Sequence, residues 1–291
     1  MKPAPFDYVL ADSIDSALSA LSAAGGGGKL LAGGQSLMPM LNFRLARPSV
    51  LIDISRIPDL AYIREEPNAL RIGALTRHYQ LETSPVIKSH LPVLSEAMNH
   101  VAHLAIRNRG TIGGSLSHAD PAAELPMMTM LLDAKLHIRS QRGTRISSAV
   151  EFFQSALTTS LAPDEMLTEI ELPKLAAHTG WGFEEVARRD GDFALAAVAA
   201  TLTMAQGRVA QARIAMMGVG ETPLRATAAE ALLSGASLDA RTVGLVVDAV
   251  RAAIQPNTDL HASSDYRRHL AGVLAERVIQ AAWARATGGQ A

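Results

Sequence analysis

The stretch Ala32-Gly33-Gly34-Gln35-Ser36 and its later counterpart Thr111-Ile112-Gly113-Gly114-Ser115 decide how this sequence is interpreted. In each, a Gly-Gly pair is accompanied by small polar residues. Glycine allows positive φ, lets consecutive backbone N–H groups converge, and has no Cβ to keep an anion at a distance. The hydroxyls of Ser36, Thr111 and Ser115 can also donate. Together the two segments favour a neutral cradle for a diphosphate, although the same residues are also typical of ordinary turns.

Neither segment matches the two best-known phosphate-binding motifs. The dinucleotide-binding fold requires G-x-G-x-x-G, and the P-loop requires G-x-x-x-x-G-K-[ST]. A third candidate, Gly218-Val219-Gly220, is followed by Glu221-Thr222-Pro223 instead of a helix with a third glycine. The sequence therefore predicts a phosphate site of neither standard type.

The composition excludes several classes of function. The 291 residues contain no cysteine, which excludes disulfides, thiolate nucleophiles, cysteinyl flavin and iron–sulfur clusters held by this chain. A net charge of −1 without a long basic run argues against nucleic acid as the main partner. No stretch approaches the roughly 20 apolar residues that span a bilayer, and no secretory signal is visible, so we expect a cytoplasmic chain without a membrane span.

Apolar periodicity predicts a small α/β part over residues 1–56. A strand–helix–strand–helix–strand order is expected there, with strands at residues 6–10, 29–32 and 50–54. For residues 57–175 the sequence predicts a region of mixed strands and helices, with two β-hairpins at 60–72 and 135–147. Between the hairpins, Ile106–Asp120 is expected to be an irregular loop, and Asp120-Pro121 is expected to open a helix.

The remaining residues, 176–291, predict an antiparallel sheet followed by helices. Three strands are expected at residues 181–188, 194–205 and 208–217, and three helices at 227–234, 239–253 and 264–286. The chain as a whole is therefore predicted to be α+β.

The two glycine segments also carry a resemblance to a known family. The similarity extends over Ala32 to Pro39, Ile106 to Ser115, His118 to Pro126 and Arg188 to Ala194, and in length and layout it covers essentially the whole chain. The chain resembles the FAD-binding medium (flavoprotein) subunit of the molybdenum hydroxylases, the family of carbon monoxide dehydrogenase and xanthine dehydrogenase. The resemblance implies two FAD-clasping α/β subdomains of the vanillyl-alcohol-oxidase/p-cresol-methylhydroxylase type, at 1–56 and 57–175. A C-terminal α+β domain of the carbon monoxide dehydrogenase flavoprotein type would follow at 176–291.

The resemblance also implies which residues bind FAD. The first segment would line the diphosphate, Thr111, Gly114 and Ser115 would contribute from the second, and Ala102 would pack nearby. Glu124 would accept hydrogen bonds from cofactor hydroxyls, and Leu167 would meet the ring system. The implied residues of the first segment are Leu30, Leu31, Ala32, Gly33, Gly34, Gln35, Ser36 and Leu37.

Two positions depart from the family pattern. Glu184 stands where some relatives carry a basic residue, and Phe193 stands where some have tyrosine beside the flavin. Both leave the electron acceptor open between NAD, a quinone, a cytochrome and oxygen.

For the other candidate residues, ordinary structural roles are favoured over functional ones. His100 and His103 lack a third ligand at suitable spacing, so no metal site is predicted. His118 with Asp120 resembles part of an acid–base pair, but a structural role as a loop histidine beside a helix cap is favoured. No Ser-His-Asp arrangement or pair of catalytic carboxylates is recognisable, so no catalytic residue is predicted, as expected where a flavin does the chemistry.

The implied function is electron transfer within a larger enzyme. A large partner would carry the molybdenum cofactor and hydroxylate the substrate, a small partner would relay electrons through 2Fe-2S clusters, and FAD on this chain would pass them to an acceptor. A dimer of such heterotrimers is expected. The substrate stays open between carbon monoxide, an aldehyde, a purine and another N-heterocycle. Two alternatives are a stand-alone FAD-dependent oxidoreductase of the same fold superfamily and a scaffold that has lost its flavin.

Overall fold

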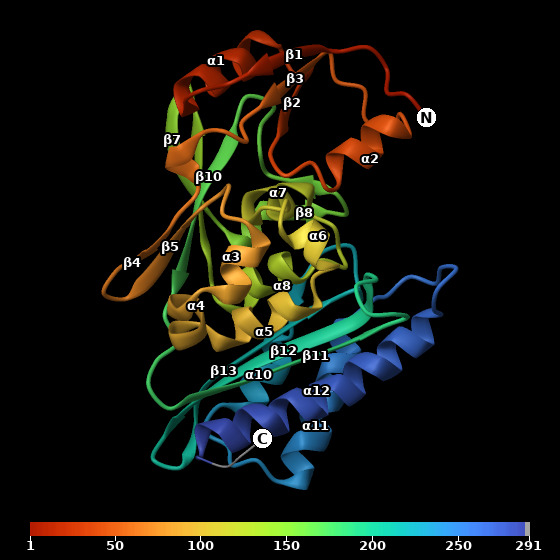
Figure 1. Cartoon of the computed structure of the whole chain (residues 1–291). Coiled ribbons are helices and arrows are strands. Elements are labelled where there is room, and N and C mark those ends of the chain that lie inside the picture. The colour runs from red at the N-terminus through yellow and green to blue at the C-terminus, as the bar shows by residue number, and fades with distance from the viewer. Residues whose placement is uncertain (289–291) are drawn as a thin grey trace. The chain divides into compact units, whose positions relative to one another are not determined.

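The computed structural model describes residues 1–288 and divides the chain into two compact units (Figure 1). The first unit comprises residues 1–81, 103–119 and 134–173. The second comprises residues 82–102, 120–133 and those from 174 onward. Each unit draws on segments that are far apart in the sequence. The division into residues 1–56, 57–175 and 176–291 is a different partition, by sequence range, and stays a prediction.

The first unit begins with a three-stranded parallel sheet. Its strands are β1 (Asp7–Leu10), β3 (Val50–Asp53) and β2 (Gly28–Leu31), in that spatial order, and α1 (Ile14–Ala23) and α2 (Leu37–Asn42) lie between them in the sequence. The Ser13 hydroxyl caps α1 by accepting from the Ser16 N–H at 3.2 Å. Below that cap, Leu18 and Leu21 are buried in a core with Ile52. The predicted order of elements is confirmed.

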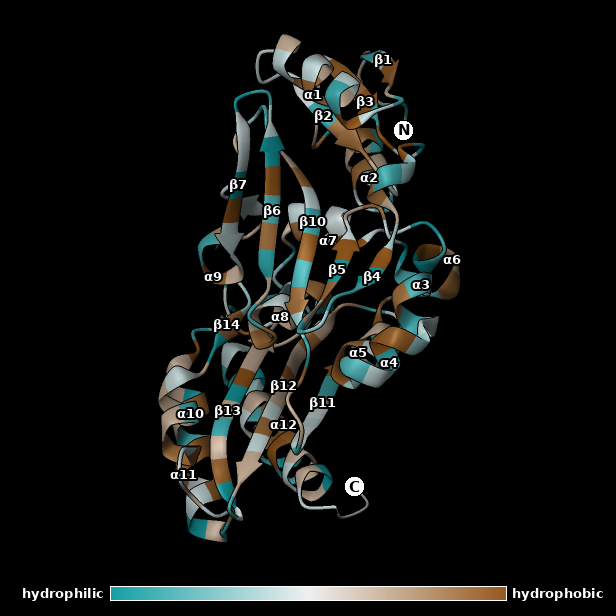
Figure 2. Cartoon of the chain, turned by 90° about the vertical axis from the view of Figure 1, so that its left-hand side faces the viewer, coloured by the Kyte–Doolittle hydropathy of each residue, from teal (hydrophilic) through white to brown (hydrophobic). Residues whose placement is uncertain are grey.

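A five-stranded antiparallel sheet completes the first unit. Its order is β4 (Ile63–Glu65), β5 (Ala69–Gly73), β10 (Met166–Pro173), β6 (Lys135–Ser140) and β7 (Gly143–Ser148). Both predicted hairpins are confirmed, although the first begins at Ile63 because Pro58–Leu60 forms a short 3-10 helix, η1. Polar and apolar residues alternate along β6 and β10 (Figure 2), which indicates that one face of the sheet is buried.

The segments between these strands form short helices and one two-stranded sheet, and they are distributed over the two units. The helices are α3 (His78–Thr83), α4 (Pro85–His90), α5 (Pro92–His100), α6 (Leu104–Arg107), α7 (Ile112–His118), α8 (Glu124–Leu131) and α9 (Ala149–Phe152), and the two-stranded sheet consists of β8 (Phe153–Ser155) and β9 (Thr158–Thr159).

The prediction of an irregular loop over Ile106–Asp120 was wrong, because α7 occupies half of it. The Gly-Gly pair within α7 has low helix propensity, but contacts with the rest of the unit outweigh it. The N–H of Gly113 donates to the Ala74 carbonyl at 2.8 Å, and a Cβ on Gly113 would collide with Ala74. The predicted helix at Asp120 was also misplaced. The Asp120 carboxylate accepts from the Ala122 N–H at 2.9 Å in a turn, and α8 begins only at Glu124.

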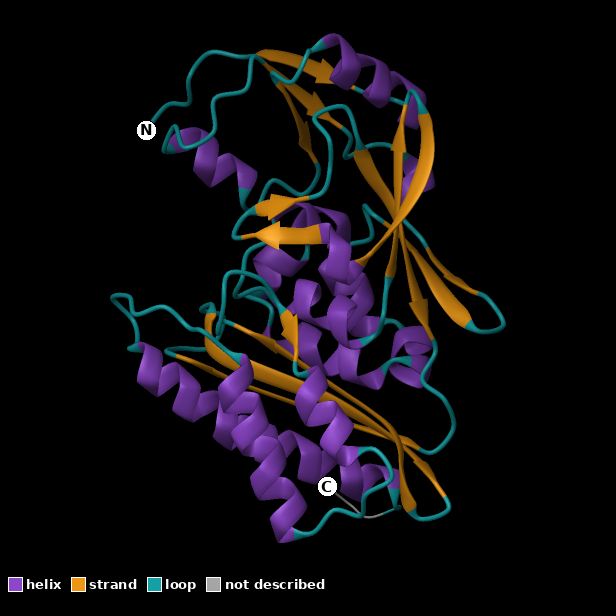
Figure 3. Ribbon diagram, turned by 180° about the vertical axis from the view of Figure 1, so that it is seen from behind, coloured by secondary structure: helices purple, strands orange, loops and turns teal. Residues whose placement is uncertain are grey.

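The second unit is built on a four-stranded antiparallel sheet. Its order is β11 (Thr179–Ala187), β12 (Ala194–Ala205), β13 (Arg208–Met217) and β14 (Leu224–Arg225). The three predicted strands are confirmed, but the two-residue β14 was missed. The helices α10 (Thr227–Leu233), α11 (Ala240–Ala253) and α12 (Ser264–Ala286) confirm the three predicted ones and cover one face of this sheet (Figure 3). Because α5 and α8 contact the other face, β12 is apolar and buried on both sides from Ala194 to Leu202.

Two glycines of β11 let the last helix approach closely. A Cβ on Gly182 would collide with the backbone of Val278, and one on Gly180 would collide with the backbone of Ala282 and Ala286. The backbone of α12 therefore packs directly on the strand at these glycines. Over residues 1–288, no helix is both long and apolar enough to cross a membrane.

Candidate functional site

The first glycine segment follows directly after β2, and its backbone at Gly33 and Gly34 has a geometry that suits glycine better than other residues. Gly34 has φ of +72°, in the left-handed region. A side chain on Gly33 would collide with the carbonyl of Arg109 and the backbone of Gly110. The Gln35 side chain closes the turn, since its Nε2 donates to the Gly33 carbonyl at 2.9 Å. A specific geometric constraint therefore explains why each residue of the first pair is glycine.

The contact at Gly33 places the two glycine segments side by side within the first unit. Arg109 and Gly110 directly precede Thr111, so the backbone of the first segment packs on the entrance to the second. The sequence predicted one cradle made of two distant segments. The structure brings the two segments together, and their binding of a diphosphate stays a prediction.

The second segment is the beginning of helix α7, and most of its N–H groups already have partners. The N–H of Ile112 donates to the Thr76 carbonyl at 3.0 Å, and that of Gly113 donates to Ala74. The N–H of Gly114 donates to the Thr111 hydroxyl at 3.1 Å, which caps the helix. Among the described residues, this segment can still offer the hydroxyls of Thr111 and Ser115 and the N–H of Thr111.

The first segment supplies the backbone donors. Among the hydrogen bonds of the described residues, none has the N–H of Gly33, Gly34, Gln35 or Ser36 as its donor. Successive free N–H groups around a left-handed glycine form the kind of concavity that binds anions. Ser36 precedes α2 but makes no capping hydrogen bond, so its hydroxyl is also available. These residues fit a diphosphate, with most of the backbone donation coming from the first segment.

The other predicted binding residues divide between the units. Leu30 and Leu31 lie half-buried on β2, and Ala32 and Leu37 flank the turn half-buried. Leu167 is buried on β10 of the same unit. Ala102 and Glu124 belong to the second unit. Ala102 has φ of +44°, and Glu124 is the first residue of α8 and is buried.

Burial raises the pKa of Glu124 to about 7, and the nearby charge of Asp120 adds to the effect. Glu185, on β11 of the same unit, is its electrostatic neighbour. Burial and the charge of Glu124 raise the pKa of Glu185 to about 8. Among the described residues, Glu185 Oε2 has no hydrogen-bond partner, and Oε1 lies 3.8 Å from Nδ1 of His100. A second buried carboxyl therefore accompanies the predicted one.

Sequence reasoning missed Glu185. It lies next to Glu184 in a strand without regular polar–apolar alternation, and nothing in the sequence indicates that Glu124 of α8 comes near it. The interaction with Glu124 arises from packing within the second unit, which only the fold reveals.

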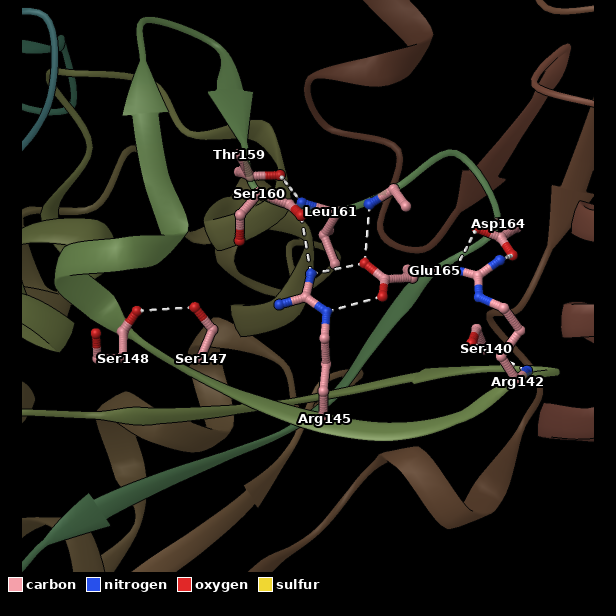
Figure 4. Close-up of polar contacts among 11 residues, drawn as sticks. Ser140, Arg142, Arg145, Ser147, Ser148, Thr159, Ser160, Leu161, Asp164 and Glu165 are labelled. Carbon is pink, nitrogen blue, oxygen red and sulfur yellow. Dashed lines mark hydrogen bonds and ion pairs between the residues drawn. The ribbon is translucent and has the colours of Figure 1, made fainter.

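An ion-pair network in the first unit fixes the start of β10, the strand that carries Leu167 (Figure 4). Arg145 on β7 donates to both Glu165 oxygens, at 2.8 and 2.6 Å, and to the Ser160 carbonyl at 2.8 Å. Glu165 also accepts from the Ala162 N–H at 2.8 Å. Its pKa is lowered chiefly by the hydrogen bond from Arg145. This network, also absent from the sequence prediction, holds residues 160–165 against the hairpin.

Two family models together match nearly the whole chain. The FAD binding domain in molybdopterin dehydrogenase matches residues 4–175, and the CO dehydrogenase flavoprotein C-terminal domain matches residues 181–282. The chain belongs to this flavoprotein family. FAD is therefore the cofactor of the chain, which is part of an oxidoreductase, and the residues of the first segment fit its diphosphate.

Relatives in this flavoprotein family match over nearly their full length. Subunit alpha of the 6-hydroxypseudooxynicotine dehydrogenase complex of Paenarthrobacter nicotinovorans is 43% identical, with 98% of this chain and 97% of the relative covered. The carbon monoxide dehydrogenase medium chain of Hydrogenophaga pseudoflava is 38% identical, with 98% and 99% covered. The predicted resemblance to molybdenum hydroxylase medium subunits is confirmed.

Solved structures give the same result for the fold. Carbon monoxide dehydrogenase from Hydrogenophaga pseudoflava matches with a TM-score of 0.96 at 40% identity, covering 98% of this chain and 99% of that one. Quinoline 2-oxidoreductase from Pseudomonas putida 86 matches with a TM-score of 0.93 at 38% identity, with the same coverage. The predicted FAD-binding region followed by a C-terminal α+β domain is confirmed.

Proposed function

We propose that this chain is the FAD-carrying electron-transfer subunit of a molybdenum-containing hydroxylase. It receives electrons from 2Fe-2S clusters on a small partner and passes them to an external acceptor, while a large partner with the molybdenum cofactor acts on the substrate. The observation that carries the proposal is the contact of Gly33 with Arg109 and Gly110, which joins the two glycine segments of a flavoprotein. The absence of cysteine supports it, because the chain must take its electrons from clusters held elsewhere.

The residues of this chain bind and orient the cofactor. The N–H groups of Gly33 to Ser36 and the hydroxyls of Ser36, Thr111 and Ser115 hold the diphosphate. Glu124 accepts hydrogen bonds from hydroxyls, Leu167 contacts the ring system, and Ala102 packs nearby. Bound FAD supplies the capacity to accept and release two electrons. No side chain of this subunit is needed as a general base.

The substrate is chosen by another subunit. Relatives similar along most of this chain are named for chemically unlike compounds, among them carbon monoxide, caffeine and glyceraldehyde. A medium subunit that contacted the substrate would differ more between such enzymes. We place the chain in the cytoplasm, in a dimer of heterotrimers.

Purification of the chain from its native host tests this division of labour. We expect it to co-purify with a molybdenum subunit and a 2Fe-2S subunit, and to bind FAD when isolated. The isolated chain should show no turnover of the organic substrate that the complex oxidises. A single-subunit yellow protein that oxidises the substrate would favour the stand-alone oxidoreductase instead, and a chain without flavin absorbance would favour the scaffold.

A further inference from the structure

Arg77 lies beside the second glycine segment and is held there by the backbone. It follows β5 and precedes α3, and its backbone forms an isolated antiparallel bridge with Thr111. The next residue, His78, donates its N–H to the Gly110 carbonyl at 3.0 Å. The position of Arg77 relative to the two segments is therefore set by main-chain hydrogen bonds and does not depend on its side chain.

The side chain of Arg77 reaches the point where the two segments meet. Its Nη1 donates to the carbonyl oxygen of Arg109. That carbonyl is also the group that leaves no room for a Cβ on Gly33. The guanidinium thus lies next to the first segment, and only one of its five N–H groups has an acceptor among the described residues.

This arginine has no ion-pair partner within residues 1–288. It is half-buried, and none of the ion pairs of the described residues includes Arg77 or Arg109. Burial lowers the pKa of Arg77, and repulsion from Arg109 lowers it further. Asp53 acts in the opposite direction, but its effect is smaller than that of burial or of Arg109, and it forms no ion pair with Arg77 among the described residues.

Two neighbouring cations, one of them partly desolvated, are unfavourable unless an anion joins them. We propose that Arg77 binds the FAD diphosphate and supplies the positive charge that the neutral glycine segments lack. The inference rests on the proposed assignment of those segments to the diphosphate. It gives the site a charged donor at the junction of the two segments, where the sequence indicated only neutral ones.

Two substitutions separate charge from the contact with Arg109. Arg77→Gln keeps a donor for the Arg109 carbonyl but removes the charge, and Arg77→Lys keeps both. Arg64→Gln removes one positive charge elsewhere in the same unit and is the matched control. Each full-length variant is stripped of FAD, and its FAD dissociation constant is measured at two salt concentrations, together with the melting temperature of the apoprotein.

We expect Arg77→Gln to weaken FAD binding about 10- to 100-fold and to make its salt dependence shallower. Arg77→Lys should retain most of the affinity and the salt dependence, and Arg64→Gln should match the parent chain. Parent-like FAD affinity in Arg77→Gln would overturn the inference. A loss of affinity with unchanged salt dependence would overturn it too, because Arg77 would then act only by holding the Arg109 carbonyl.

A substitution at Gly34 distinguishes failure of this inference from failure of the proposed site. Gly34→Val should abolish FAD binding if the first segment holds the diphosphate. If that variant folds and still binds FAD normally, the assignment of the segments is wrong, and the role of Arg77 is rejected with it. If Gly34→Val loses FAD and Arg77→Gln does not, only the role of Arg77 is wrong.

Discussion

The hydroxyl of Thr111 accepts the backbone N–H of Gly114 at 3.1 Å, three residues further along the chain. This contact makes Thr111 the N-cap of α7 and gives Gly114 a role that the sequence alone did not suggest. A Cβ on Gly114 would lie 2.8 Å from that hydroxyl oxygen, closer than a real Cβ approaches an oxygen. Gly114 is thus tied both to the cap and to the predicted diphosphate site.

Gly114→Val should therefore yield apoprotein. The added side chain displaces the Thr111 hydroxyl, so the hydroxyl that the second segment is proposed to offer to the diphosphate is lost. The ratio of flavin absorbance to protein measures occupancy after gentle purification. Gly143→Val is a useful comparison, because Gly143 has open space around its Cβ position, although its positive φ adds strain. Normal FAD occupancy in Gly114→Val would show that the second segment does not hold the diphosphate.

Thr111→Val tests the cap separately from the glycine. Loss of the cap should lower the free energy of unfolding of the apoprotein by about 1 kcal/mol, and FAD binding should weaken as well. Thr111→Ser keeps the hydroxyl and should restore both properties. Denaturant unfolding and FAD titration of the two variants give the measurement. Equal stability of Thr111→Val and Thr111→Ser would mean that the hydroxyl contributes nothing to α7.

The elements that the sequence predicted well are those governed by local pattern. The helical pattern of α12 and the long apolar run of β12 are local signals, and both elements were predicted with the bounds that the structure has. The helix α7 was missed because Gly113 and Gly114 are poor helix formers, and its stability comes from Thr76 and Ala74, nearly 40 residues earlier. A short helix held by distant carbonyls has no local signature.

The site was predictable only in part for the same reason. The pair Gly33-Gly34 indicates an unusual backbone conformation, and the resemblance to the family supplied the other predicted binding residues. Arg77 and Glu185 carry no motif, and their importance follows from neighbours that the fold brings to them. Charged residues whose partners come from distant segments are the part of a site that one sequence does not reveal.

Arg145 should contribute measurably to stability through Glu165. The Glu165 carboxylate is buried, while the Arg145 guanidinium is about 40% exposed. Arg145→Ala leaves the carboxylate with a single N–H donor, and we expect a loss of about 1–2 kcal/mol in the free energy of unfolding, reduced by the exposure of the arginine. The double variant Arg145→Ala with Glu165→Ala should lose clearly less unfolding free energy than the two single variants lose in sum. Strict additivity in denaturant unfolding would mean that the pair is not coupled.

The buried carboxyls Glu124 and Glu185 should make the chain less stable as pH rises. Their pKa values of about 7 and 8 in the folded protein exceed the usual value near 4.5, chiefly because of burial. At pH values between about 4.5 and 8, these two carboxyls bind more protons in the folded state than in the unfolded state. Their contribution is therefore complete below about pH 4 and is lost as pH rises through 7 and 8, with a slope of at most about 1.4 kcal/mol per pH unit for each group.

Glu185→Gln isolates one of the two contributions, because glutamine has nearly the same shape and cannot ionise. Relative to the parent chain, this variant should gain stability between pH 6 and pH 9 and show a shallower decline. Glu184→Gln is the matched control, since Glu184 is the adjacent residue on β11, is about 40% exposed and pairs with Arg277 at 3.3 Å. Denaturant unfolding of the apoprotein at several pH values gives the curves. Parallel curves for Glu185→Gln and the parent chain would show that Glu185 does not titrate in this range, and any remaining decline of stability with pH would then have to come from other groups such as Glu124.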